Sequence, residues 1–185
     1  MTRITISITT TLAFLCLVCS SQEVESTNRA AWKKISSWRV PMPKVRVVSG
    51  CELLIDGVRC RLFGVQLPKD AAQAASAKRF LEFYIKNYGD YFSIYNTDNP
   101  VSSKDGVPLI WLHGHGNGGW AQETLVEAGL LSVDYGGHEE YRFRVPAKSG
   151  EEEFDWKKCL KEAVSSHQAG KKPNVNFDWP ESRPK

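Results

Sequence analysis

The stretch from residue 44 to residue 68 constrains the fold more than any other part of the sequence. It reads KVRVVSGCELLIDGVRCRLFGVQLP, three short apolar runs separated by Ser49-Gly50 and Asp56-Gly57. Asp-Gly between two apolar runs is a strong signal for a two-residue hairpin turn, because both residues tolerate the left-handed backbone that the turn needs. The stretch therefore predicts three consecutive antiparallel strands, at residues 45–48, 51–55 and 58–65.

The turn at Asp56-Gly57 also fixes which residues face each other. With two residues in the turn, Ile55 pairs with Val58, Leu53 with Cys60 and Cys51 with Leu62. Cys51 and Cys60 are then diagonal neighbours on one face, roughly 7–8 Å apart and at the edge of disulfide reach. A bridge between them and two buried thiols are both compatible with this register.

Helices and further strands are predicted after Pro68. Asp70 can cap a helix that runs to about Asn87, where apolar residues recur at helical spacing before a stop at Gly89. The remaining pattern predicts strands at 91–95 and 108–113, and helices at 120–130 and 151–168, the last with the acids Glu151–Glu153 at its start and Gly170 at its end. Strands and helices in this order predict an α+β fold, a five-stranded OB-type β-barrel with three helices.

The first 21 residues have the layout of a secretory signal peptide. Arg3 precedes an apolar stretch from Leu12 to Cys19, which is followed by small residues. The stretch is too short to span a membrane, although a buried N-terminal helix or strand would also fit. A signal predicts a secreted protein, or one of the periplasm or cell envelope. The predicted organisation is a signal peptide at 1–21, a polar lead at 22–43, one domain at 44–170 and a tail at 171–185.

The charge balance does not favour nucleic acid as a partner. Removing Arg3 from the 24 Lys and Arg leaves 23 against 21 Asp and Glu, a net charge of +2. Dedicated nucleic-acid binders usually carry a basic stripe or patch. The sequence therefore leaves the partner unknown, with a protein partner also open.

Cys159, like Cys51 and Cys60, would enter an oxidising compartment. Because these cysteines are odd in number, at least one thiol stays outside any internal bridge.

Three segments carry a family resemblance. They read VRVVSGCELLIDGVRCRLFGVQLPKDAAQAASAKRFLEFYIKN, KDGVPLIWLHG and AQETLVEAGLLSVDY. In order and spacing, residues 45 to 170 resemble the staphylococcal nuclease (thermonuclease, TNase-like or SNase-like) family. The match is best in the strand before Pro68, in the alanine-rich helix, and around ETLVEAGL with Tyr135, which are mainly scaffold positions. The resemblance implies an SNase-like OB-fold and, in active members, calcium-dependent hydrolysis of phosphodiesters.

The residues expected at the family's active site are mostly replaced. Such chemistry needs oxygen ligands for the cation, a carboxylate base and guanidinium groups on the phosphate. Cys51 and Gln66 stand where the resemblance implies metal-binding aspartates, and Lys69 stands at the place of the base. Val107 replaces the second arginine, so Arg61 is the one retained catalytic position. A charged lysine repels a cation and cannot accept a proton from water.

Two functions follow from this pattern. The leading prediction is an exported SNase-like protein, a pseudoenzyme without cofactors that acts as a non-catalytic binding or interaction module. The alternative is a calcium-dependent phosphodiesterase (endonuclease) with a displaced or partial site, in which Glu52 faces Arg61 across the hairpin and Asp105 lies near the lost arginine. Glu52 and Arg61 also suit a plain cross-strand ion pair.

Two other patterns have a functional and a structural interpretation. His113 and His115 in WLHGHGNGGW could share one side of an extended chain and bind zinc or copper, but a structural site needs four ligands, and a glycine-rich loop is the simpler interpretation. Aromatic residues could stack on nucleic-acid bases, as in OB barrels, or fill the core. These aromatic residues are Tyr91, Phe92, Tyr95, Trp111 and Trp120.

Overall fold

A computed structural model describes eight parts of the 185-residue chain: residues 40–41, 45–88, 90–94, 105–114, 119–136, 141–147, 150–173 and 175. The predicted signal peptide and most of the predicted lead and tail lie outside these parts. Among the described residues, no helix combines the length and the apolar character needed to cross a membrane. The described fold is mixed α+β, with three helices.

The three-stranded meander is confirmed. Asp56 and Gly57 have φ angles of 49° and 83°, the left-handed backbone that a two-residue hairpin turn requires. Ile55 pairs with Val58 and Leu53 with Cys60, as the turn predicts. The strands are β2 (Val45–Ser49), β3 (Glu52–Ile55) and β4 (Val58–Leu62), all antiparallel.

The predicted strand over residues 58–65 is too long. It ends at Leu62, and Gly64, with φ of 73°, turns the chain. The next two residues form β5 (Val65–Gln66), which leaves the main sheet and pairs with β8 (Ser132–Val133). The pairing of β5 with β8 therefore holds the loop after β4 beside the segment that follows the helix over residues 121–127.

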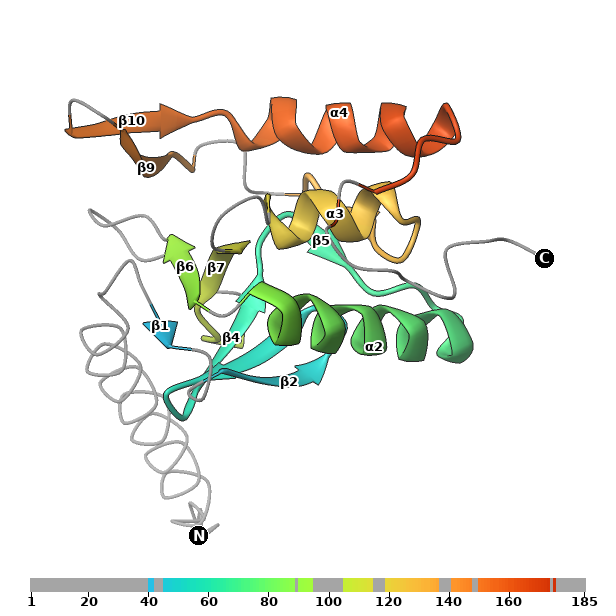
Figure 1. Ribbon diagram of the computed structural model, residues 1–185, viewed down its shortest axis with the longest axis horizontal. Helices are drawn as coiled ribbons and strands as arrows, with labels where there is room; N and C mark the ends of the chain where they lie inside the picture. The colour runs from blue at the N-terminus through green and yellow to red at the C-terminus, as the bar shows by residue number, and fades with distance from the viewer. Residues whose placement is uncertain are drawn as a thin grey trace, which may run out of the picture.

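One sheet organises the fold (Figure 1), in the order β1-β6-β7-β4-β3-β2. The predicted strands at 91–95 and 108–113 are present as β6 and β7, each shifted by about a residue. β4 and β7 run parallel, and the other neighbours run antiparallel. No pairing between the described residues closes this sheet into a barrel. The three strands that complete the sheet beside the meander are β1 (Val40–Pro41), β6 (Asp90–Ile94) and β7 (Leu109–Gly114).

The sheet must nevertheless be strongly curved. β1 and β2 are the two ends of the strand order, yet only three residues separate Pro41 from Val45. Four Cα–Cα steps span at most about 15 Å. The edges of a flat six-stranded sheet would lie about 24 Å apart. The short connection therefore requires the sheet to curl so that its two edges approach each other.

Two helices pack on the sheet, and a third packs on one of them. In α2 (Ala71–Tyr88), Asp70 caps the first turn as predicted, since its Oδ1 accepts the N–H of Gln73 at 2.8 Å. α2 packs against β2 and against α3 (Ala121–Glu127), which in turn packs against α4 (Trp156–Gln168). The helix predicted at 120–130 is thus shorter than expected, because Gly129, with φ of 69°, ends it.

The predicted start of the last helix at residue 151 is wrong. Residues 150–154 form β10 (Gly150–Phe154), which pairs with β9 (Phe143–Ala147) in a separate hairpin (Figure 1). The helix begins after Asp155, whose Oδ1 accepts the N–H of Lys158 at 2.9 Å. The acids Glu151–Glu153 therefore lie on a strand that pairs with β9, and not at a helix start. Gly170, with φ of 66°, follows the helix as predicted.

Candidate functional site

The metal and base positions named by the family resemblance lie between β2 and β3 and at the end of β5. Cys51 lies between β2 and β3, and its thiol is within hydrogen-bond reach of the backbone of Leu67, just after β5. Gln66 and Lys69 are exposed, whereas Cys51 is buried. Burial raises the pKa of the Cys51 thiol, so the group stays protonated at neutral pH. A protonated thiol and an ammonium group are not calcium ligands, and the Gln66 amide offers one neutral oxygen where a charged carboxylate is expected.

Arg61 is held by two carboxylates. Its Nε and Nη2 donate to Glu52 Oε1 at 2.9 and 2.6 Å, and its Nη1 and Nη2 donate to the Asp105 carboxylate at 3.4 and 3.0 Å. The cross-strand pairing of Glu52 with Arg61 is the one that the hairpin register predicts. All three nitrogens of the guanidinium group therefore have a carboxylate partner.

A second arginine shares Glu52. The Arg59 Nη2 donates to Glu52 Oε2 at 2.6 Å, so both carboxylate oxygens face a guanidinium group. The Glu52 side chain is only 11% exposed, against 56% for Arg59 and 30% for Arg61. Burial works against the charged carboxylate, but the hydrogen bonds from Arg59 and Arg61 outweigh it and lower the pKa of Glu52. Partial burial likewise opposes the charged guanidinium, and bonding to Glu52 and Asp105 raises the pKa of Arg61.

This charge network links the meander to β7. Asp105 lies just before β7, and the N–H of Arg61 donates to the carbonyl oxygen of Pro108 at 2.8 Å. Val107, which stands where the family resemblance implies a second arginine, is half-buried. Two guanidinium groups and two carboxylates balance to zero net charge. Over the described residues, no group of three or more His, Cys, Asp or Glu side chains is arranged to hold a metal ion.

The three cysteines outside the predicted signal peptide are free and buried. Of the two interpretations of Cys51 and Cys60, the structure has the one with two buried thiols and no bridge. Burial raises the pKa of Cys60 to about 12, and burial and nearby glutamates, Glu123 first among them, raise the pKa of Cys159. Such thiols are poor nucleophiles and metal ligands, because both roles need the thiolate.

The histidine and aromatic candidates lie in different surroundings in the structure. His113 lies on β7 and packs edge-on against Trp120, with ring centroids 4.6 Å apart, while His115 lies outside the described residues. Trp111 is fully buried in the core, so it offers no stacking surface. Tyr91 and Phe92 lie on β6, but their side chains, and all of Tyr95, lie outside the description.

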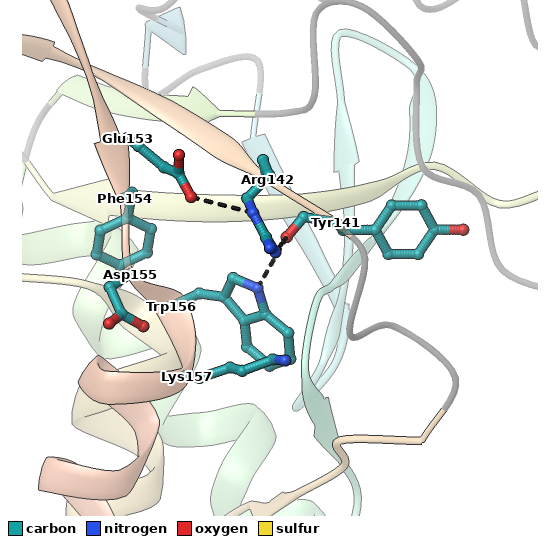
Figure 2. Close-up of a pocket in the computed structure, with 7 residues that line it drawn as sticks. All are labelled: Tyr141, Arg142, Glu153, Phe154, Asp155, Trp156 and Lys157. Atoms are coloured by element: carbon teal, nitrogen blue, oxygen red, sulfur yellow. Dashed lines mark hydrogen bonds and ion pairs between the residues drawn. The ribbon is translucent and has the colours of Figure 1, made fainter.

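A hollow of about 350 Å³ lies where the β9–β10 hairpin meets α4 (Figure 2). Arg142 and Glu153 form an ion pair across it at 3.1 Å, and the Trp156 Nε1 donates to the carbonyl oxygen of Tyr141 at 3.2 Å. Lys157 lies over the Trp156 ring, 5.6 Å from its centroid. Sequence reasoning missed this hollow, because it depends on β10, which was predicted as helix. Its lining also includes Phe154 and Asp155.

Comparison with known proteins adds no assignment to these sites. No protein-family model matches the sequence, and a search of curated proteins finds no significant match.

Proposed function

We propose that the chain is an SNase-like protein with an OB-type barrel that has lost nuclease chemistry and works as a non-catalytic binding or interaction module. The strand order supports the barrel. The five predicted strands are consecutive neighbours in the sheet, and β4 pairs with β7 although β6 comes before β7 along the chain, as a Greek-key arrangement requires. The three-residue connection between β1 and β2 favours closure, since it draws the two edges of the sheet together.

The loss of nuclease chemistry rests on one observation, the capture of Arg61 by Glu52 and Asp105. An arginine that stabilises a phosphoryl transition state must direct its N–H groups at the phosphate oxygens. In this chain Nε, Nη1 and Nη2 all donate to carboxylates. The same two carboxylates are occupied by guanidinium groups, which argues against their use as ligands for a displaced calcium ion.

Export through residues 1–21 belongs to the same proposal and rests on the sequence alone. Secretion or a place in the periplasm or cell envelope follows from it. The partner class stays open between protein and nucleic acid, and the neutral network around Arg61 favours a partner that does not depend on phosphate contacts there.

A cleavage assay tests the function. Purified protein is incubated with single-stranded DNA and RNA, with and without calcium, beside Arg61→Ala. We expect no calcium-dependent cleavage by either protein. Cleavage that needs calcium and is lost in Arg61→Ala would establish the phosphodiesterase alternative. Binding of the same nucleic acids at low salt separates the partner classes, because a nucleic-acid module gives salt-sensitive association and a protein-binding module gives none.

A further inference from the structure

The outer edge of the β9–β10 hairpin has no partner strand among the residues that the structure describes. β9 contacts β6, whereas β10 pairs with β9 alone and lies on the side of the hairpin away from the main sheet (Figure 1). An edge strand presents a row of N–H and C=O groups that can pair with another chain. The hairpin also lies outside the three segments that carry the family resemblance, so this edge is a surface separate from the Arg61 network.

The hairpin register decides which backbone groups point outward. Only two residues separate Ala147 from Gly150, which face each other, so this pair closes the turn and exchanges hydrogen bonds. In an antiparallel ladder, such pairs alternate with pairs whose backbone groups point away from the partner strand. The outward groups of β10 therefore belong to Glu151, which faces Pro146, and to Glu153.

The two edges of the hairpin are not equivalent. On β9 the outward position facing Glu151 is Pro146, which has no N–H, so that edge lacks a donor for strand pairing. On β10 both outward residues have an N–H and a carbonyl oxygen, two residues apart, as a partner strand requires. β10 is thus the edge of this hairpin that can add a strand.

The charge of β10 selects the chemistry of the added strand. The strand contains three acids and no base, and Glu152 and Glu153 are exposed on opposite faces, because successive side chains of a strand alternate. A second copy of β10 would place glutamates opposite glutamates, which is destabilising. The pairing with β9 shows the complement, since Arg144 faces Glu153 in the register and Arg142 forms an ion pair with it.

We propose that β10 docks an extended, basic segment of a partner protein as an added antiparallel strand. Backbone hydrogen bonds at Glu151 and Glu153 hold the segment, and its lysines or arginines lie against the glutamates. The inference rests on the proposed function as an interaction module and names the class of its partner. Nucleic acid is excluded from this edge, because the same acids repel phosphates.

The test uses the peptide Lys-Thr-Lys-Thr-Lys-Thr-Lys with blocked ends, and the same peptide N-methylated at two adjacent central residues. The methyl groups block both edges of the peptide and keep its charge. We expect the unmodified peptide to bind the full chain at low salt at least about tenfold more tightly than the methylated one, because methylation removes backbone hydrogen bonds. In NMR spectra, the largest shifts should fall on the amides of Glu151 and Glu153.

Two variants at one position provide a matched comparison in the protein. Glu151→Pro and Glu151→Gln lose the same charge, but only the proline removes an outward N–H, and that group is not used in pairing with β9. Glu151→Pro should therefore bind the unmodified peptide several-fold more weakly than Glu151→Gln does. If Glu151→Pro does not fold, the two peptides on the wild-type chain decide.

The other outcomes overturn the proposal. Equal binding of the two peptides would mean that charge alone attracts them, and no binding at low salt would mean that β10 is not a docking edge. Equal affinities of folded Glu151→Pro and Glu151→Gln would exclude strand addition, and oligothymidylate that shifts the same amides would identify a nucleic-acid surface instead. Calcium-dependent cleavage in the nuclease assay would defeat the proposed function, whereas loss of peptide binding without cleavage would defeat this inference alone.

Discussion

The side chain of Gln122 accepts a hydrogen bond from the backbone N–H of Leu112, at 3.2 Å from nitrogen to Oε1. Its Nε2 donates to the carbonyl oxygen of Ile110 at 2.8 Å, so the amide pairs with β7 as a short strand would. Gln122 is fully buried, and this pairing joins α3 to the sheet.

Replacing Gln122 by Ala should destabilise the protein by roughly 2–4 kcal/mol, because two buried backbone groups of β7 lose their partner at about 1–3 kcal/mol each, less any relaxation. Urea unfolding measures the change. Gln73→Ala, at an exposed position of α2, is the control and should change the free energy of unfolding by less than about 0.5 kcal/mol. Equal effects of the two variants would show that the buried pairing contributes nothing.

Arg61→Ala should destabilise the folded state by about 1–3 kcal/mol, since it leaves the mostly buried Glu52 with one of its two cations. Arg142→Ala is the matched control. Arg142 and Glu153 also form an ion pair, but their side chains are 61% and 67% exposed, and such pairs contribute at most about 1 kcal/mol. Thermal and urea unfolding at low and high salt compare the two, and a larger loss in Arg142→Ala would contradict this ranking.

Glu123 should make stability fall as pH rises. Burial first, and then the charges of Glu127 and Glu162, raise the pKa of Glu123 above its ordinary value of 4.5, despite hydrogen bonds from the Trp120 backbone and the Cys159 thiol. A raised pKa in the folded state means that the protonated form is favoured there. The benefit is complete below the unfolded value and is lost as pH rises through the folded one.

Glu123→Gln should therefore be more stable than the wild type at pH 7 to 8, with the difference disappearing near pH 4. Urea midpoints across this range measure it. Glu82→Gln, on the exposed face of α2, removes the same formal charge and controls for the change in net charge. A pH-independent difference between Glu123→Gln and the wild type would refute the assignment.

Gly50 and Gly57 should respond differently to alanine. A Cβ at Gly50 would lie 2.5 Å from the Cβ of Ala77 on α2, whereas Gly57 faces open space and has a left-handed backbone. We expect Gly50→Ala to cost about 3 kcal/mol through overpacking and Gly57→Ala about 1 kcal/mol through backbone strain. Adding Ala77→Gly should recover part of the first loss and none of the second, as a double-mutant cycle would measure.

The parts of the fold that could be predicted are those encoded locally. Asp56 and Gly57 specify the turn, the turn fixes the register, and the register places Glu52 opposite Arg61. Asp70 marks the start of α2 in the same local way. The strand β10 could not be predicted, because the acids at 151–153 lack strand-like alternation and become a strand only through pairing with β9.

The candidate site was predictable only in part for the same reason. Arg59 joins Glu52 diagonally across the hairpin, which depends on the reach of a long side chain and not on the register alone. Asp105 was predicted to lie near the position where the family resemblance implies a second arginine, but its contact with Arg61 depends on β7 docking beside β4. The hollow at the root of the β9–β10 hairpin requires that hairpin, so no local pattern indicated it.

The two partners of Arg61 should join it at different stages of folding. Glu52 is nine residues away along the chain, within a hairpin that can form in roughly 1–10 μs, whereas Asp105 is 44 residues away. The second contact must wait for a much longer loop to close. Folding and unfolding rates of Glu52→Gln and Asp105→Asn should accordingly give the higher φ-value for Glu52, and the reverse order would contradict this sequence of events. Arg61 would then meet β7 with Glu52 already bound and with one positive charge of the network left for Asp105 to balance.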